Sequence, residues 1–375
     1  MAEKRRGHNE GSVYFDANKD RWIAAISLGP GKRKKVACKT KKEAIEKKNE
    51  LLREAGQGTL PTGPQQKLKD YLPDWLENIQ KDKLRISSYV KYKQLMKYII
   101  DELGEIWLQK LTPEQVKRFY NKKLAEGLST KTVHSIHELL HVSLETAVSW
   151  NYVPRNVCDV IDPPRIVSRQ ATPLTLDQAK ILLEHVKEHR LEVLLTMAIV
   201  TGMRRGELLA LRWSCVDLER GIVVVLKTVD WLPKYGYVEN EPKTKTGKRA
   251  ILIPPFLITM LIEHKKKQEI SKKRYGEAWE NLGLVFPDLH GGYFSPNYLW
   301  RSFDKILLEA GLPHIPFHDL RHSAATILLS MGVNVKVIQE LLGHSHISIT
   351  LGTYSHLLPS MQEGVPNVWT DLFQK

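Results

Sequence analysis

The chain has 375 residues, enough for two or three domains, and its 42% hydrophobic content excludes an intrinsically disordered or collagen-like chain. Its three cysteines lie far apart, which argues against disulfides; no apolar run reaches the roughly 18 residues that span a bilayer, and the charged N-terminus predicts no signal peptide. Its 56 lysines and arginines exceed its 42 acidic residues by 14, a surplus that favours a cytoplasmic, nucleic-acid-binding protein over a membrane protein.

Half of this surplus lies in the first 55 residues, which hold 15 basic and 8 acidic residues. Three short apolar runs between residues 12 and 39 are separated by turn-forming residues and predict three β-strands. Thr40, with Glu43 three residues later, predicts the N-cap of a basic helix. We expect residues 1–57 to form a small three-stranded sheet with one helix that binds DNA; a solvated basic surface is the alternative. The candidate DNA contacts are Arg5, Arg6, Arg21, Lys32, Arg33, Lys34 and Lys35.

A glycine- and proline-rich linker at 56–64 separates this segment from a helical region. Between residues 66 and 162, apolar side chains recur every three or four positions, which predicts a bundle of four or five helices with these side chains in its core. The polar faces carry lysines that could follow a phosphate backbone or simply be solvated. These are Lys91, Lys93, Lys97, Lys117, Lys122, Lys123 and Lys131.

A second proline-rich linker leads into a third segment, residues 174–375. Its periodicity predicts helices, interrupted by two short strands near 222–227 and 250–253. The sequence therefore predicts a multidomain, mainly α-helical protein. It has a small sheet-and-helix domain at its N-terminus, a helical bundle, and a mainly helical third domain that contains a small β-sheet or hairpin.

Three strings in this third segment carry residues suited to phosphoryl chemistry. Thr-Gly-Met-Arg-Arg-Gly-Glu contains Arg204, and His-Asp-Leu-Arg-His places His318 and Arg321 on one face of a helix start. Leu-Gly-His contains His344, ten residues before Tyr354. Singly, each string has an ordinary explanation, such as an ion pair on a helix, a capped loop or a pair of zinc-binding histidines.

Together these residues fit attack of a tyrosine on a phosphodiester. The guanidinium forks of Arg204 and Arg321 match phosphate oxygens and can stabilise the charge of the transition state. A tyrosine is a weak nucleophile and needs a proton acceptor nearby, which a histidine can provide. The departing sugar oxygen needs a proton, which a lysine can donate. Such a scheme needs no metal ion or other cofactor.

In this order the strings resemble the tyrosine recombinase (phage integrase) family, over nearly the whole chain and most closely over 174–357. The family motifs T-G-x-R-x-x-E, H-x-L-R-H, L-G-H and T-Y-x-H match here. The family's lysine commonly lies in P-K-T-x-x-x-x-R at a hairpin turn, which here is 242–249 and implies Lys243, with Lys245 as the alternative. The resemblance assigns catalysis to Arg204, Lys243, His318, Arg321, His344 and Tyr354, with Glu207 in support.

Three basic residues of the same turn, Lys245, Lys248 and Arg249, are expected to contact phosphates or solvent. The stretch 228–241 makes this hairpin region longer than in minimal family members, which leaves the geometry of its tip open. The resemblance implies that the tyrosine forms a 3′-phosphotyrosyl bond and that strands are exchanged through a Holliday junction. It also implies that neither ATP nor a metal ion is needed.

The resemblance also implies partners: double-stranded DNA at core and arm-type attachment sites, three further copies of the chain in a tetramer, and an excisionase-type directionality factor. A nucleoid-associated protein of a mobile element is expected. An amphipathic stripe at 365–373 is expected to dock on a neighbouring protomer, or else to pack on its own domain. Two other functions stay open: a type IB topoisomerase-like nicking and closing enzyme, and a DNA-binding regulator without catalysis.

Overall fold

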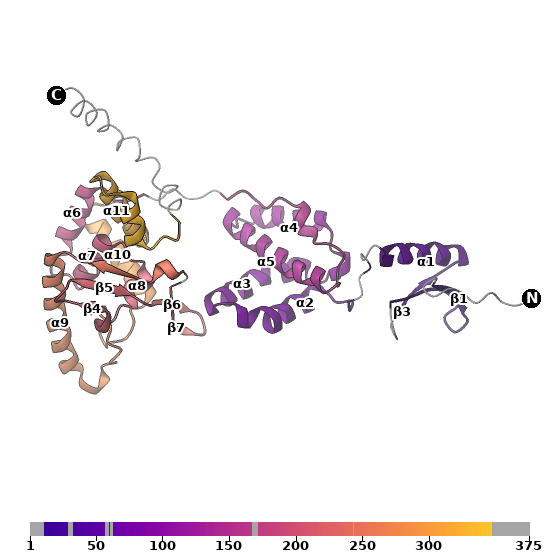
Figure 1. The fold of residues 1–375 in the computed structure, drawn as a ribbon, viewed down its shortest axis with the longest axis horizontal. Helices are drawn as coiled ribbons and strands as arrows, with labels where there is room; N and C mark the ends of the chain where they lie inside the picture. The colour runs from indigo at the N-terminus through magenta and orange to yellow at the C-terminus, as the bar shows by residue number, and fades with distance from the viewer. Residues whose placement is uncertain are drawn as a thin grey trace, which may run out of the picture. The chain divides into compact units, whose positions relative to one another are not determined.

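The computed structural model describes residues 11–28, 33–56, 60, 63–166, 172–242 and 244–346, with Lys245 described through its backbone alone. These residues form two compact units that divide between Ser168 and Arg169. Both are mainly helical, with small antiparallel sheets, as the sequence predicts (Figure 1). Within the described ranges, no helix has the length and apolar character needed to cross a bilayer.

The first unit begins with an antiparallel sheet in the order β1-β2-β3, followed by one helix (Figure 1). Thr40 caps that helix, because its Oγ1 accepts a hydrogen bond from the Glu43 amide at 3.2 Å. Ala24 and Cys38 of the sheet pack against Ala44 of the helix. The elements are β1 (Ser12–Asp16), β2 (Arg21–Ser27), β3 (Arg33–Cys38) and α1 (Lys41–Gly56).

Strand alternation divides the basic residues of this sheet between its two faces. Arg21, Arg33 and Lys35 are exposed on the face opposite α1, since Val36 and Cys38 face the helix. Lys34 lies on the helix side, where burial lowers the pKa of its ammonium group. The other predicted contacts, Arg5, Arg6 and Lys32, lie outside the described residues.

Residues 63–166 contain four α-helices around one hydrophobic core, in agreement with the predicted bundle. The largest buried side chain, Trp75, donates its indole N–H to Thr146 Oγ1 at 3.0 Å, and Tyr71 donates its hydroxyl to the Ser143 carbonyl. Both aromatic rings are therefore buried without an unpaired polar atom. The helices are α2 (Leu68–Trp75), α3 (Ile86–Leu103), α4 (Pro113–Ala125) and α5 (Thr130–Ser149).

Two lysines of α4 differ in how they compare with the predicted polar faces of this bundle. Lys122 is exposed, but its ammonium group is bonded to Glu102. The placement of Lys123 on a polar face is wrong: its side chain is 10% exposed and pairs with Glu126 at 2.8 Å. Lys123 follows Phe119 by one helical turn on the buried side of α4, and its aliphatic stem can pack there while the charge reaches a partner.

The second unit surrounds α7, whose side chains are buried on nearly all sides. Two sheets lie beside it: β4, β5 and β8 form one, and β6 pairs with β7 in the other. Its helices are α6 (Leu176–His185), α7 (Glu192–Thr201), α8 (Arg205–Leu209), α9 (Pro255–Tyr275), α10 (Pro296–Glu309), α11 (Asp319–Ser330) and α12 (Val335–Leu342). Its strands are β4 (Val216–Asp217), β5 (Ile222–Val225), β6 (Thr228–Leu232), β7 (Gly236–Asn240) and β8 (Arg249–Leu252).

The extra length at 228–241 forms a separate hairpin, β6–β7. In the sequence this hairpin lies between β5 and β8, which pair directly with each other. Glu239 of β7 anchors it, because its carboxylate accepts hydrogen bonds from Arg212 and Lys227 at 2.5 Å each and from the hydroxyl of Tyr293. The segment with the predicted lysine therefore follows this hairpin and leads into β8.

Candidate active site

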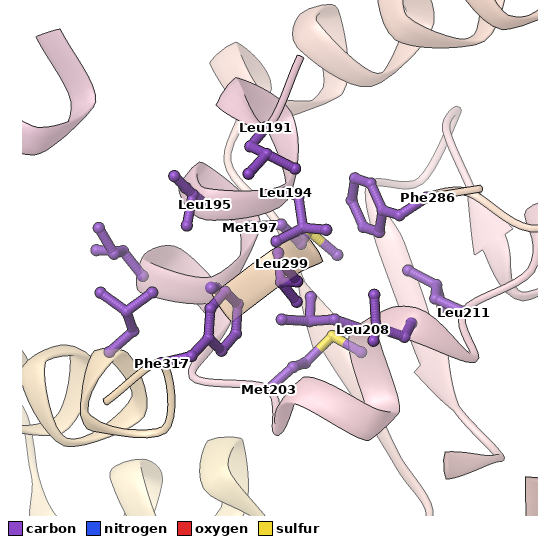
Figure 2. Close-up of a cluster of buried hydrophobic side chains, with 14 of the residues drawn as sticks. Leu191, Leu194, Leu195, Met197, Met203, Leu208, Leu211, Phe286, Leu299 and Phe317 are labelled. Carbon is purple, nitrogen blue, oxygen red and sulfur yellow. The ribbon is translucent and has the colours of Figure 1, made fainter. Parts of the chain in front are cut away.

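Buried apolar residues adjoin the predicted site residues on both sides. Met203, 2% exposed, directly precedes Arg204, Leu208, 0% exposed, directly follows Glu207, and Phe317 precedes His318. All three belong to the core around α7, and Figure 2 shows them in one cluster with Leu299 of α10. Anchoring a backbone this way fixes the position of the polar side chain beside it.

Arg204 is placed by a sharp reversal of the chain between α7 and α8. Gly202 ends α7 with φ of +60°, a left-handed conformation that favours glycine. A Cβ on Gly202 would lie 2.4 Å from Leu342 of α12, so a side chain there would also collide with that helix. The Arg204 side chain is 40% exposed and remains available to solvent or a ligand.

Glu207 holds Arg204 from inside the domain. Its carboxylate, 2% exposed, accepts hydrogen bonds from Arg204 Nη1 at 2.7 Å and from the Arg204 amide at 3.0 Å. Burial alone would raise the pKa of this carboxyl, but hydrogen bonds and charge from Arg249, together with Arg204, lower it below its usual value. Glu207 is therefore an ionised support for Arg204, as expected.

Arg321 lies on α11, 4% exposed. Its Nη1 donates a hydrogen bond to the Gly202 carbonyl at 2.8 Å, which joins α11 to the turn that carries Arg204 although the residues are 119 positions apart. His318 immediately precedes α11, and its ring meets that of His322 edge to face with centroids 5.6 Å apart. The spacing that suggested a zinc pair thus places the two rings in edge-to-face contact.

His344 follows α12 directly and belongs to the same charged environment. Burial, then the positive charges of Arg321 and Arg204, lower the pKa of His344 to about 4. Burial and the neighbouring His322 and Arg321 also lower the pKa of His318. Both imidazoles are neutral at pH 7, so each can accept a proton or donate a neutral hydrogen bond.

Some predicted site residues are not described. Lys243, Tyr354 and the stripe at 365–373 lie outside the described residues, as does the side chain of Lys245. The Lys248 side chain is exposed, and its ammonium group pairs with the exposed carboxylate of Glu241 at 2.9 Å. Its availability to a phosphate stays a prediction.

Arg249 corrects the prediction of a phosphate or solvent contact. Its side chain is 7% exposed and bonded to Glu207, so its guanidinium is committed inside the domain. Strand alternation could have indicated this, because Arg249 shares its side of β8 with Ile251, which is 2% exposed.

The one group of possible metal ligands found among the described residues belongs to the helical bundle. It consists of His141, Glu145 and Asp159. His141 Nε2 and Asp159 Oδ1 are 3.0 Å apart, and Asn156 donates its amide to Glu145 at 2.8 Å. Hydrogen bonds within the bundle account for this cluster.

Comparison with known proteins identifies the family of this chain. Residues 173–361 match the model of the phage integrase family, and residues 67–124 match that of the phage integrase N-terminal SAM-like domain. A tyrosine recombinase XerC-like protein of Caldanaerobacter subterraneus subsp. tengcongensis is 32% identical over 96% of this chain and 98% of its own length.

Two solved structures share the fold. The integrase of transposon Tn1549, in complex with transposon right end DNA, superposes with a TM-score of 0.68 at 20% identity and covers 79% of this chain and 98% of its own. A lambda integrase tetramer bound to a Holliday junction superposes with a TM-score of 0.54 at 17% identity, over 89% of this chain and 95% of its own. The chain belongs to the phage integrase family of tyrosine recombinases, because it matches the family model over residues 173–361 and a relative over nearly its full length.

Proposed function

We propose that this protein is a site-specific recombinase that integrates and excises a mobile element by breaking and rejoining DNA through Tyr354. The observation that carries the proposal is the convergence of Arg204, Arg321 and His344 from three separate motifs. The positive charges of the two arginines lower the pKa of His344, and Glu207 and the Gly202 carbonyl hold the arginines in place. A pair of guanidinium groups with neutral imidazoles suits a phosphodiester that gains negative charge in its transition state.

Each side chain receives one role. Arg204, Arg321 and His344 bind and stabilise the phosphoryl group, and His318 accepts the proton of the Tyr354 hydroxyl. The Tyr354 oxygen forms a bond to phosphorus while the bond to the 5′ oxygen breaks, and Lys243, or Lys245 as the alternative, gives that oxygen its proton. The 5′-hydroxyl of a partner strand reverses these steps, so no bond energy is lost.

The division of labour along the chain is also part of the proposal. The helical bundle at 66–162 and the third domain at 174–375 would hold core-site DNA, and residues 1–57 would bind arm-type sites as a separate domain. The first segment has its own small cores, distinct from that of the bundle, which supports treating it separately. A tetramer coupled through residues 365–373, with a directionality factor for excision, follows from the family resemblance and the lambda integrase tetramer.

Covalent trapping tests the reaction. A core-site duplex with a nick beside the cleavage position loses the short strand that carries the 5′-hydroxyl, so the cleaved complex cannot religate. We expect the 375-residue protein to form a protein–DNA adduct on this substrate that survives SDS. The adduct should also form in the presence of EDTA. Failure to form any adduct would favour a DNA-binding regulator, and relaxation of supercoils without strand exchange would indicate a type IB topoisomerase-like enzyme.

Charge reversal tests the arm-binding role of the exposed sheet face. We expect the triple variant Arg21→Glu, Arg33→Glu, Lys35→Glu to lose at least about 100-fold in affinity for arm-site duplexes, because each residue faces away from α1 and can neutralise a phosphate. Affinity is measured by fluorescence anisotropy on duplexes tiled across the ends of the element. Trapping on core DNA should be unaffected.

The control carries the same charge change at exposed positions away from this face, in Lys19→Glu, Lys42→Glu, Arg53→Glu. It should weaken arm binding much less, through long-range repulsion alone. Equal losses in the two triple variants would show that net charge, and not this face, determines binding.

A further inference from the structure

The Arg249 side chain joins three segments that are distant in the sequence. Its Nη2 donates to Glu207 Oε2 at 3.0 Å and its Nη1 to Glu207 Oε1 at 3.3 Å, an arrangement in which the fork of the guanidinium meets both carboxylate oxygens. Its Nε donates to the carbonyl of Leu341, in the last turn of α12, at 2.6 Å. One guanidinium thus bonds to the support of Arg204 and to the helix end that precedes His344.

The same guanidinium also faces the segment in which the catalytic lysine is expected. Nη1 lies 3.3 Å from the Gly247 carbonyl, and the Gly247 amide donates to the Thr244 carbonyl at 2.9 Å to close a tight turn. A Cβ on Gly247 would lie 2.5 Å from the Pro242 ring, so the two ends of this short loop pack directly on each other. Holding Gly247 therefore holds Pro242, the residue before Lys243.

The glycine of the Leu-Gly-His motif fits against this loop. Gly343 has φ of +67°, and a Cβ on it would lie 2.8 Å from the Thr246 carbonyl and 3.1 Å from Arg249 Cδ. A contact this close admits only glycine and fixes the spacing between the loop and the start of the His344 segment.

We propose that Arg249 is a positioning residue that fixes Pro242 and residues 244–248 relative to Arg204 and His344, and that protonation of the departing 5′ oxygen by the lysine expected in this turn depends on it. This inference rests on the proposed function. This role of Arg249 differs from the phosphate contact expected from the sequence, because the Arg249 side chain is 7% exposed and bonded within the domain. Lysine cannot replace it, since one ammonium group cannot reach Glu207 and the Leu341 carbonyl in the same fork geometry.

The test compares two leaving groups in single-turnover cleavage of a core-site suicide substrate. One substrate has the normal 5′ oxygen at the scissile position, and the other has sulfur there. A thiolate leaves without protonation because thiols are far more acidic than alcohols, so the sulfur substrate does not depend on the lysine. Loss of lysine placement and loss of the fold therefore give different results.

We expect Arg249→Met to cleave the oxygen substrate about 100-fold more slowly than the wild type, and the sulfur substrate within about threefold of it. Methionine preserves the volume of the aliphatic stem, and Arg204 remains as a partner for Glu207. Arg249→Lys, which keeps the charge, should cleave the oxygen substrate about tenfold more slowly than the wild type and the sulfur substrate at the wild-type rate. Core-site affinity, measured by anisotropy, should be unchanged in both variants.

The matched control is Arg220→Met, an arginine 80% exposed in the turn before β5, at the other end of the same sheet. It should cleave both substrates at the wild-type rate. The inference is overturned if Arg249→Met cleaves the oxygen substrate at the wild-type rate, or if its cleavage rates on the two substrates fall by the same factor. A wild type that forms no adduct on either substrate overturns the proposed function instead.

Discussion

Tyr354→Phe is expected to form no covalent adduct with a nicked core-site substrate, while its affinity for that DNA stays within about twofold of the wild type. The substitution removes one oxygen and keeps the ring, so packing and DNA contacts change little. Without the hydroxyl there is no atom to bond to phosphorus, and the residual rate should fall below detection. The measurement is a denaturing gel of end-labelled DNA after incubation with each protein.

Tyr298→Phe is the matched control for this experiment. Tyr298 lies on α10, is 42% exposed, and has no role in the proposed reaction. It should form adduct at the wild-type rate. If Tyr354→Phe still became linked to DNA, the nucleophile would be another residue, and mapping the modified peptide by mass spectrometry would identify it.

Arg204→Lys should bind core-site DNA nearly as well as the wild type and cleave it about 1,000-fold more slowly. The lysine keeps the positive charge that steers DNA, but it lacks the planar fork that can bind two phosphate oxygens while one nitrogen stays bonded to Glu207. The rate is measured in single turnover, and the affinity separately by anisotropy on uncleavable DNA.

The neighbouring Arg205→Lys is the control, because Arg205 is exposed at the first position of α8 and has no contact with Glu207 in the proposed site. It should cleave at close to the wild-type rate. If Arg204→Lys lost binding and cleavage by the same factor, Arg204 would be a DNA-binding contact and not a residue that stabilises the transition state.

Local signals predicted the elements of this fold well. A helix cap such as Thr40, together with three- and four-residue periodicity, identifies a helix because capping and burial of one face depend on neighbours within a turn or two. The first strand is where it was expected, at Ser12–Asp16. The separate hairpin β6–β7 was missed, because its length indicated an insertion without indicating its pairing.

Charged side chains were harder to place from the sequence. Lys34, Lys123 and Arg249 all looked like surface cations, yet the structure turns the first toward α1, pairs the second with Glu126 and buries the third against Glu207. Composition and charge count cannot separate these cases. Which face a cation occupies depends on the partner that packs there.

The sequence by itself determined the residue types of the candidate site and their order. Arg204, His318, Arg321 and His344 were predicted from motifs of a few residues each, and Glu207, predicted as the support of Arg204, is hydrogen-bonded to it. These features are local, because the chemistry of an arginine or histidine and the start of a helix are encoded within one short string.

Only the tertiary structure decided how those strings meet. Arg321 bonds to Gly202 across 119 positions, and Arg249 joins Glu207 to Leu341 across 42 and 92 positions. Gly202 is favoured by its positive φ, and Gly343 by its positive φ and by the Thr246 carbonyl, which lies 2.8 Å from where a Cβ would be. Such contacts come from packing between distant elements, and the energy of a buried ion pair depends on a geometry that exists only after the chain has folded.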